Sequence, residues 1–228
     1  MTKLNKSLLL TWKDPVSRRN FTIGQLCLNT NFTFKYCGDF AEAEKYGWVK
    51  LNAFPEEKTY ASENMFPIFS SRLPDRKRRD IHNILENYQL SVYDEFELLR
   101  RSEGRLPIDT YSFIDPIFPD DESIERTFYI MGVRHYANCN GQDCSLLTNI
   151  NVDDSLLFAK EPSNKYDPDA IQVLTHSKEL LGYVPRYYNK AILKRLNNKM
   201  SYSCVVVDIN LHSECSECIK VKLNMPKD

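Results

Sequence analysis

The chain has 228 residues, a formal net charge of −1, 42% hydrophobic residues and 12% aromatic residues. This length suits one or two hydrophobic cores, and the composition excludes an intrinsically disordered chain. The near-zero net charge excludes a global attraction to nucleic acid or membranes, so any nucleic-acid contact has to come from a local patch.

The first segment has the pattern of β-strands. Residues 8–12 and 21–28 predict a hairpin that turns at Lys13-Asp14-Pro15. Residues 31–36 alternate aromatic with polar side chains, which places three rings on one face of a strand. We therefore expect a three-stranded antiparallel meander. Residues 39–64 show no clear period and are interpreted as loop with short elements.

Two helices are predicted after this sheet. Apolar residues recur at helical spacing from Ile81 to Tyr88, and Asp75 is the expected N-cap. A second helix is expected after Ser91 as its cap, with Phe96 and Leu99 on the buried side. Residues 1–114 are therefore predicted to form an α+β N-terminal domain.

Residues 115–125 hold two prolines and an acidic run, which is typical of a linker. Strands are predicted after it at 128–133, 155–160, 170–174, 180–184, 202–210 and 219–225. A helix is expected at 188–197, with Ala191, Ile192 and Leu196 pointing inward and Lys190, Lys194 and Arg195 pointing outward. We expect residues 126–228 to be mainly β, as a small, partly open barrel with one helix.

Three sequence motifs follow one another in the second half of the chain. Gly132-Val133-Arg134-His135-Tyr136 ends a predicted strand, residues 160–173 read KEPSNKYDPDAIQV, and residues 181–186 read LGYVPR. These motifs resemble the HIRAN domain family, whose pattern is Gly-x-Arg-x-Tyr, then Glu/Asp-Pro-x-Asn-x-Tyr-Asp-x-x-Ala-Ile-x-Val, then Gly-Tyr-Val/Ile-Pro. The resemblance implies a non-catalytic, OB-like small barrel that grips the free 3′ end of single-stranded DNA. The Gly182-Tyr183-Val184-Pro185 turn is interpreted as structural.

The resemblance also implies roles for single residues. Arg134 contacts a phosphate, Tyr136 offers a stacking face, and Arg186 is a further phosphate contact. The pocket for the terminal nucleotide is lined by Asn164, Tyr166 and Asp167, and Asp167 accepts a hydrogen bond from the 3′-hydroxyl.

Two positions depart from the family pattern. Lys165 stands where the family often has proline, which favours phosphate binding but loosens the loop. His135 stands where another aromatic residue occurs, and it stacks less broadly. Sequence-independent single-strand binding is therefore a safer expectation than strict 3′-end capture.

The chemistry of these residue types agrees with that interpretation. An aromatic ring stacks on any base, which contributes about 1–3 kcal/mol per base, and a guanidinium pairs with phosphate. A carboxylate is repelled by phosphates, so it suits a position where a free hydroxyl replaces one. The alternative is that Asn164 and Asp167 only form a turn and that Tyr166 packs under the barrel.

The first half has a fainter resemblance. Gly24, residues 32–36, Phe66-Pro67, Leu73-Pro74-Asp75 and Leu98-Leu99 follow the order seen in the N-terminal subdomain of HipA-like kinases, although Arg76 replaces a glycine. No ATP-binding or catalytic-loop pattern is present in the sequence. The resemblance implies a detached, non-catalytic piece that acts in a toxin–antitoxin system. A HipA-like serine/threonine kinase is therefore a second expected partner, and an antitoxin-like regulator is the alternative function.

Cysteine usage bears on location and on metals. The seven cysteines are scattered, and we expect a cytoplasmic protein with reduced thiols, no secretory signal and no membrane partner. Four of them have spacing compatible with zinc, namely Cys139, Cys144, Cys215 and Cys218. Free thiols, and therefore no cofactor, are the expected alternative.

Two further patterns have ordinary explanations. The run of Arg72 and residues 76–79 is the densest basic cluster, and it is interpreted as a solvated helix start, with DNA or an acidic partner as the alternative. Asp167 and Asp169 suggest a metal nuclease, but no third acid or lysine is suitably spaced. We therefore predict that the protein is not an enzyme.

Overall fold

The computed structural model describes residues 6–118, 123–136, 150–210 and 217–226. The chain divides into two compact units, Met1–Pro116 and Ile117–Asp228. This division lies within the 115–125 stretch, whose role as a linker stays a prediction. Among the residues described, no helix is long and apolar enough to cross a membrane.

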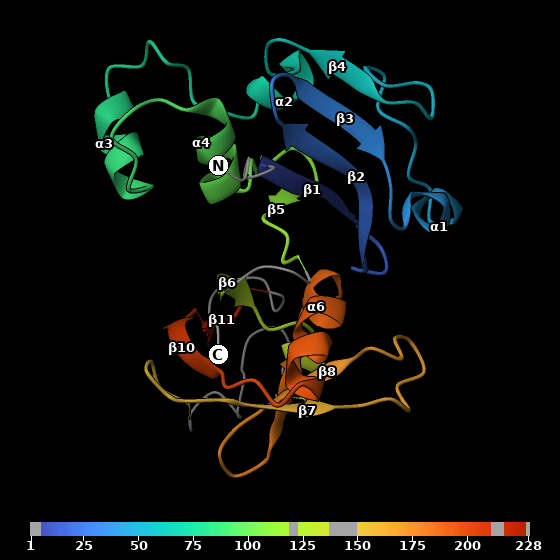
Figure 1. Ribbon diagram of the computed structural model, residues 1–228, viewed down its shortest axis with the longest axis vertical. Coiled ribbons are helices and arrows are strands. Elements are labelled where there is room, and N and C mark those ends of the chain that lie inside the picture. The colour runs from blue at the N-terminus through green and yellow to red at the C-terminus, as the bar shows by residue number, and fades with distance from the viewer. Residues whose placement is uncertain (1–5, 119–122, 137–149, 211–216, 227–228) are drawn as a thin grey trace. The chain divides into compact units, whose positions relative to one another are not determined.

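The first unit is built on a five-stranded antiparallel sheet in the order β4-β3-β2-β1-β5 (Figure 1). Its strands are β1 (Lys6–Lys13), β2 (Asn20–Leu28), β3 (Phe32–Tyr36), β4 (Tyr60–Ser62) and β5 (Tyr111–Ile114). Strands β1 to β3 pair antiparallel as the predicted meander, and β4 and β5 extend it at its two edges. The alternation in β3 buries Phe32, Phe34 and Tyr36, as predicted.

The core of the first unit is aromatic. The ring of Phe34 lies 4.4 Å from that of Phe54 and 5.3 Å from that of Phe69, and Phe69 is 5.0 Å from Phe113. The hydroxyl of Tyr36 donates to the carbonyl of Phe54 at 2.6 Å. These contacts hold the long connection between β3 and β4 against the sheet.

The two helices predicted in the first unit, α3 and α4, begin later than predicted, and two short helices that were not predicted precede them. In chain order, the helices are α1 (Phe40–Lys45), α2 (Pro67–Ser70), α3 (Ile81–Asn87) and α4 (Glu95–Ser102). The prediction of Asp75 as a cap is wrong, because α3 starts after Asp80, and Asp75 instead accepts the backbone N–H of Lys77 within a turn. The prediction of Ser91 as the cap of the second helix is also wrong, because α4 starts at Glu95. Asp94 caps that helix and accepts the N–H of Glu97 at 3.0 Å.

The basic run does not start a helix. Arg72 turns into the unit, where its guanidinium makes two hydrogen bonds to Asp109, at 2.8 and 2.6 Å, and a third to the carbonyl of Gly104 at 2.6 Å. Arg78 pairs with Asp80 at the surface. Arg72 therefore fixes the segment after α2 to the segment before β5.

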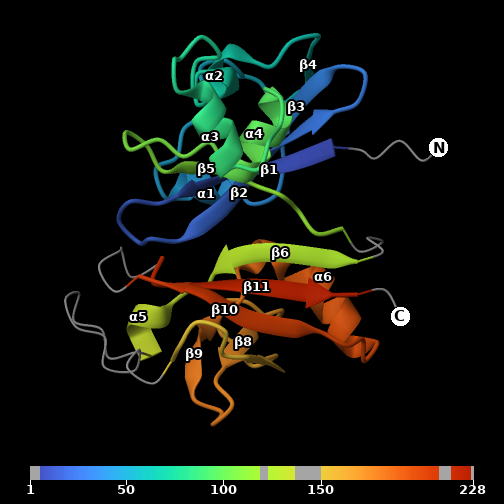
Figure 2. The same cartoon turned by 90° about the vertical axis from the view of Figure 1, so that its left-hand side faces the viewer.

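The second unit contains two three-stranded antiparallel sheets, β10-β11-β6 and β7-β8-β9. Their strands are β6 (Ile124–Tyr129), β7 (Leu157–Lys160), β8 (Ile171–Leu174), β9 (Leu180–Tyr183), β10 (Ser203–Ile209) and β11 (Ile219–Met225). Figure 2 shows β6, β11 and β10 side by side. Single bridges, Met131 with Tyr183 and Ser155 with Val205, join the two sheets at both ends. The six strands thus form a small barrel, as predicted.

Three local predictions for the second unit are wrong. The first strand ends at Tyr129, because Gly132 turns the chain at a φ of +78° and residues Val133–Tyr136 form the short helix α5. Helix α6 (Arg186–Asn197) begins two residues early, directly after Pro185. Arg195 is 3% exposed and does not point outward, because it shares the buried face of α6 with Tyr188 and Ile192.

Candidate nucleic-acid interface

The connection between β7 and β8 forms a turn that the side chain of Asn164 holds. Its Oδ1 accepts the backbone N–H groups of Tyr166, at 2.9 Å, and Asp167, at 3.2 Å. Its Nδ2 donates to Oε2 of Glu161 at 2.8 Å. Asparagine side chains commonly stabilise turns in this way. Both polar atoms of the Asn164 side chain are therefore used within the turn. This agrees with the alternative prediction that Asn164 stabilises a turn.

Asp167 connects this turn to the start of α6. Its Oδ1 accepts the N–H of Asp169 at 2.9 Å, and its Oδ2 accepts Nδ2 of Asn189 at 2.8 Å. The Nε atom of Arg186 lies 3.9 Å from the same Oδ2. A carboxylate oxygen accepts more than one hydrogen bond. Asp167 is thus held in place and still has acceptor capacity at the surface, where its side chain is 16% exposed.

Tyr166 projects from the turn into solvent. It is 88% exposed, and Lys165 beside it is also exposed. The alternative that Tyr166 packs under the barrel is therefore wrong. An exposed ring on a turn that is fixed by Asn164 offers a flat face to a ligand at little conformational cost.

The side chains of α5 approach this turn through β9. The backbone N–H groups of Met131 and Tyr183 donate to each other's carbonyls at 2.8 and 2.9 Å, which sets α5 beside β9. The rings of Tyr136 and Tyr183 are 5.7 Å apart, with their hydroxyl oxygens at 3.4 Å. The Tyr183 hydroxyl donates to Oε2 of Glu161 at 2.8 Å. One chain of contacts therefore runs from Tyr136 to Asn164.

The protonation states of Tyr183 and Glu161 maintain these contacts. Burial, together with the hydrogen bonds to Tyr136 and Glu161, raises the pKa of Tyr183 far above its usual range, so its hydroxyl stays a donor. Hydrogen bonds from Asn164 and Tyr183 lower the pKa of Glu161, so its carboxylate stays an acceptor. Both groups therefore keep these roles at neutral pH.

Close approach of the backbone explains the glycine in β9. A Cβ atom at Gly182 would lie 2.4 Å from the carbonyl oxygen of Met131, the residue that bridges to Tyr183. A side chain there would push α5 away from β9. The Gly182 turn is thus structural, as predicted, and it also positions Tyr136.

The remaining predicted residues, Arg134 and His135, belong to α5. Arg134 and His135 are exposed on α5, and Nε of Arg134 donates to Nε2 of His135 at 3.2 Å. Contacts therefore connect Tyr136 to Asn164 and Asp167 to Arg186, while Lys165 and Tyr166 project from the turn between them. Sequence reasoning missed Glu161, Tyr183 and Asn189. The first two lie in the quoted motifs, whereas Asn189 has no signal in the sequence.

Comparison with known families supports the sequence interpretation of the second unit. Residues 125–224 match the model of the HIRAN domain family. This part of the chain is a HIRAN domain. HIRAN domains are generally non-catalytic modules, and the match indicates nucleic-acid binding, typically to DNA.

Two solved structures are similar to the chain. One is the HIRAN domain of human HLTF, with 18% identity over 47% of this chain and 82% of that chain and a TM-score of 0.36. The other is a protein from Lactobacillus plantarum, with 22% identity over 45% of this chain and 94% of that chain and a TM-score of 0.37. No curated protein matches the sequence. The HipA-like resemblance of the first unit is not confirmed, and its kinase partner stays a prediction.

The zinc prediction for the HIRAN domain is largely outside the described residues. Cys139, Cys144 and Cys215 lie in segments that the structure does not describe, and Cys218 is buried just before β11. Within residues 6–118, 123–136, 150–210 and 217–226, no group of three or more metal-binding side chains is arranged around a common point. Zinc therefore stays a prediction.

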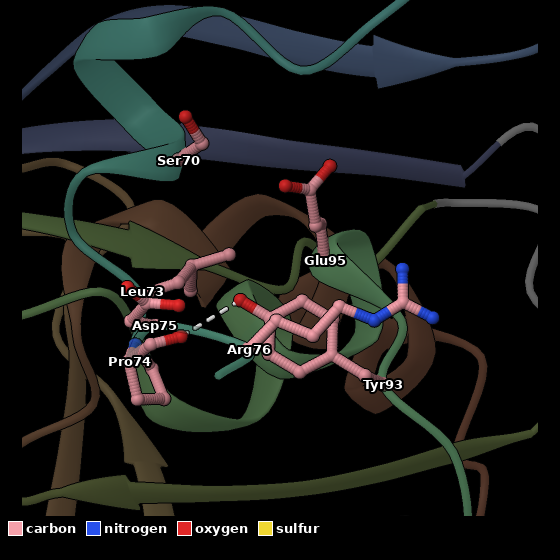
Figure 3. A pocket seen from close by; sticks show the side chains of 7 residues that line it. All are labelled: Ser70, Leu73, Pro74, Asp75, Arg76, Tyr93 and Glu95. Carbon is pink, nitrogen blue, oxygen red and sulfur yellow. Dashed lines mark hydrogen bonds between the residues drawn. The ribbon is translucent and has the colours of Figure 1, made fainter. Parts of the chain in front are cut away.

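The first unit has a pocket of its own, apart from the HIRAN domain (Figure 3). Its volume is about 470 Å³, and it is lined by Ser70, Leu73, Pro74, Asp75, Arg76, Tyr93 and Glu95. The guanidinium of Arg76 lies 5.6 Å from the ring centre of Tyr93, whose hydroxyl donates to the carbonyl of Pro74 at 2.8 Å. None of the residues that the HIRAN resemblance implies for nucleic-acid binding lines this pocket, whereas Arg76 belongs to the basic run, for which DNA is the alternative partner.

Proposed function

We propose that the HIRAN domain binds single-stranded DNA, including its 3′ end, at the surface formed by α5, the turn after β7 and the start of α6. One observation carries this proposal: Tyr166 is 88% exposed on a turn whose backbone is fixed by Asn164. A base that stacks on this ring gains about 1–3 kcal/mol without regard to its identity. The expected binding is therefore tolerant of sequence.

Exposed cationic side chains of the same elements suit the phosphates of such a strand. Lys165 precedes Tyr166 in the same turn, and Arg186 stands beside the turn with its side chain 47% exposed. Arg134 is exposed on α5. These cations stand near the carboxylates of Glu161 and Asp167, in a chain with a net charge of −1, so the proposed attraction depends on single contacts with phosphates and not on a broad positive surface.

Asp167 supports recognition of a strand end within this site. Its carboxylate repels a phosphate but accepts a hydrogen bond from a free hydroxyl. Arg186, 3.9 Å away, attracts the phosphate on the 5′ side of that last nucleotide. The turn thus combines one group that favours a terminal hydroxyl with another that favours the adjacent phosphate.

The test measures binding of labelled single strands that end in a 3′-hydroxyl or a 3′-phosphate, over a series of salt concentrations. We expect tighter binding of the free 3′ end. Tyr166→Ala should weaken binding of both strands roughly 5- to 150-fold, the equivalent of about 1–3 kcal/mol, whereas Tyr166→Phe keeps the ring and the affinity.

Equal affinity for the two ends would refute end recognition and leave general strand binding standing. If neither strand binds, or if Tyr166→Ala binds as tightly as the natural protein, the proposed site is wrong.

A further inference from the structure

Helix α6 carries basic residues along one face and has no acidic residue. Arg186, Lys190 and Lys194 recur at a spacing of four, and all three are exposed. Side chains four residues apart lie one above the other on a helix. The three cations therefore form a row along the outside of α6, which is the orange helix in Figure 1. We call these three residues the α6 row.

Helix stability explains only one end of this row. Like charges four residues apart destabilise a helix by about 0.2–0.5 kcal/mol per pair. Arg186 is the first residue of α6, where a cation opposes the helix dipole. Lys194 lies in the last turn of α6, where a cation complements the helix dipole, so helix stability accounts for that end of the α6 row but not for Arg186 and Lys190.

The row begins at the proposed site and continues past the other end of the helix. Arg186 lies 3.9 Å from Asp167 in the turn that presents Tyr166. At the far end, the amino group of Lys160 hydrogen-bonds the side chain of Asn197, three residues after Lys194. From Arg186 to Lys194 the helix advances about 12 Å, at 1.5 Å per residue. The cations therefore extend well beyond the reach of one nucleotide.

We propose that the α6 row, with Lys160, contacts the phosphate backbone of the same strand whose terminal base stacks on Tyr166. This inference rests on the proposed function and adds the path of the strand. Charge complementarity and continuity with the site favour a nucleic-acid strand over an acidic protein surface. Lysine presents a point charge on a flexible stem, so these contacts position the strand without reading its sequence.

The experiment uses the full chain and labelled single strands of 3 and 12 nucleotides with free 3′ ends. The test variant is K190Q/K194Q, since glutamine keeps the helix propensity of lysine. The control is K220Q/K222Q, which removes the same charge from β11, where Lys222 pairs with Glu125. Urea midpoints should be unchanged in both variants.

For the 12-nucleotide strand, K190Q/K194Q should lower the salt slope of log Kobs by about 1.4, because each single-strand phosphate contact contributes about 0.7. At 0.1 M salt this corresponds to a loss of affinity of roughly 20-fold. The 3-nucleotide strand has two phosphates, one of them at Arg186, so it should lose at most one contact, which is about fivefold in affinity at 0.1 M salt. The control should resemble the natural protein with both strands.

Three outcomes would overturn the proposal. An unchanged slope for the long strand means that the α6 row serves another partner, while Tyr166→Ala would still weaken both strands if the site itself is right. An equal loss for both strands places the lysines within the terminal site. A failure of the natural protein to bind any strand removes the proposed function together with this inference.

Discussion

Arg72 in the first unit and Arg186 in the second each stand beside an aspartate, but their surroundings differ. The side chain of Arg72 is 7% exposed, and its guanidinium reaches both oxygens of Asp109 at 2.6 and 2.8 Å. The side chain of Arg186 is 47% exposed, and its single contact with Asp167 is 3.9 Å long. We call the first the closed pair, because its arginine is buried, and the second the open pair, because its arginine is exposed.

This difference separates a structural role, for Arg72, from the binding role that we propose for Arg186. A buried arginine that lacks its carboxylate leaves an uncompensated charge, so the Arg72 pair cannot be separated without damage to the fold. An exposed pair contributes little to stability, and its arginine remains available to an incoming phosphate. The aromatic residues divide in the same way, since Phe34, Phe54 and Phe69 are buried whereas Tyr166 is exposed.

The largest expected effect comes from breaking the closed pair. Arg72→Met should lower the free energy of unfolding of the first unit by about 1.5–3 kcal/mol, because the half-buried Asp109 and the carbonyl of Gly104 lose the buried guanidinium that donates to them. Urea unfolding followed by tryptophan fluorescence measures this, since both tryptophans, Trp12 and Trp48, belong to the first unit. Arg78→Met, which breaks the exposed pair with Asp80, is the control and should cost about 0–1 kcal/mol. Similar midpoints for the two variants would show that the Arg72 pair is not structural.

Acid should weaken the same pair by protonation. Burial opposes ionisation of Asp109, but hydrogen bonds from Arg72 and the N–H of Tyr111 outweigh it and lower the pKa. A lowered folded-state pKa gives stability that is present above the unfolded value of about 3.9 and is lost as pH falls below it. Tryptophan-monitored unfolding from pH 7 to pH 2.5 should show this loss. Asp109→Asn should be less stable at pH 7 and should lack this part of the pH dependence.

Asn164 offers the next test, in the second unit. Asn164→Ala removes the acceptor for two backbone N–H groups and should cost about 1–2 kcal/mol, as does the loss of a helix cap. The same change should weaken strand binding, because the turn no longer holds Tyr166. Amide hydrogen exchange of the second unit and fluorescence anisotropy measure the two effects. Ser163→Ala, at an exposed neighbouring position, is the control; if it behaves like Asn164→Ala, the hydrogen bonds are not the cause.

The smallest effect on stability is expected for the open pair. Arg186→Met should change the free energy of unfolding by less than about 0.5 kcal/mol. It should nevertheless lower affinity for a single strand about fivefold at 0.1 M salt, the contribution of one phosphate contact. A large loss of stability without a loss of binding would mean that the open pair is structural, like the Arg72 pair.

Much of the fold is predictable because its strands have clear patterns. The alternation in residues 32–36 and the β-branched runs at 203–209 and 219–225 each correspond to an observed strand. Helix α5 was missed because four residues are too few to show a helical period. Arg195 was misplaced because a charged residue is rarely buried, and only tertiary packing shows that it lies on the inner face of α6.

The candidate site was predictable only in part. Ordered motifs indicate Asn164, Tyr166 and Asp167, and the structure sets them in one turn. The link from Tyr183 to Glu161 joins residues 22 positions apart, and the contact of Asn189 with Asp167 spans the same separation. A single sequence does not show such contacts, because they depend on how the sheet and α6 pack.

The bridge between Met131 and Tyr183 has a consequence for the dynamics of the barrel. Two backbone hydrogen bonds form this seam, whereas β10 and β11 are paired along nearly their whole length. Local opening begins where the fewest bonds have to break. The barrel should therefore open first at this seam, and the amide protons of Met131 and Tyr183 should exchange with solvent before those that pair β10 with β11. Each such opening would also weaken the contact between Tyr183 and Tyr136. Local opening of the barrel would therefore make the proposed binding surface less ordered.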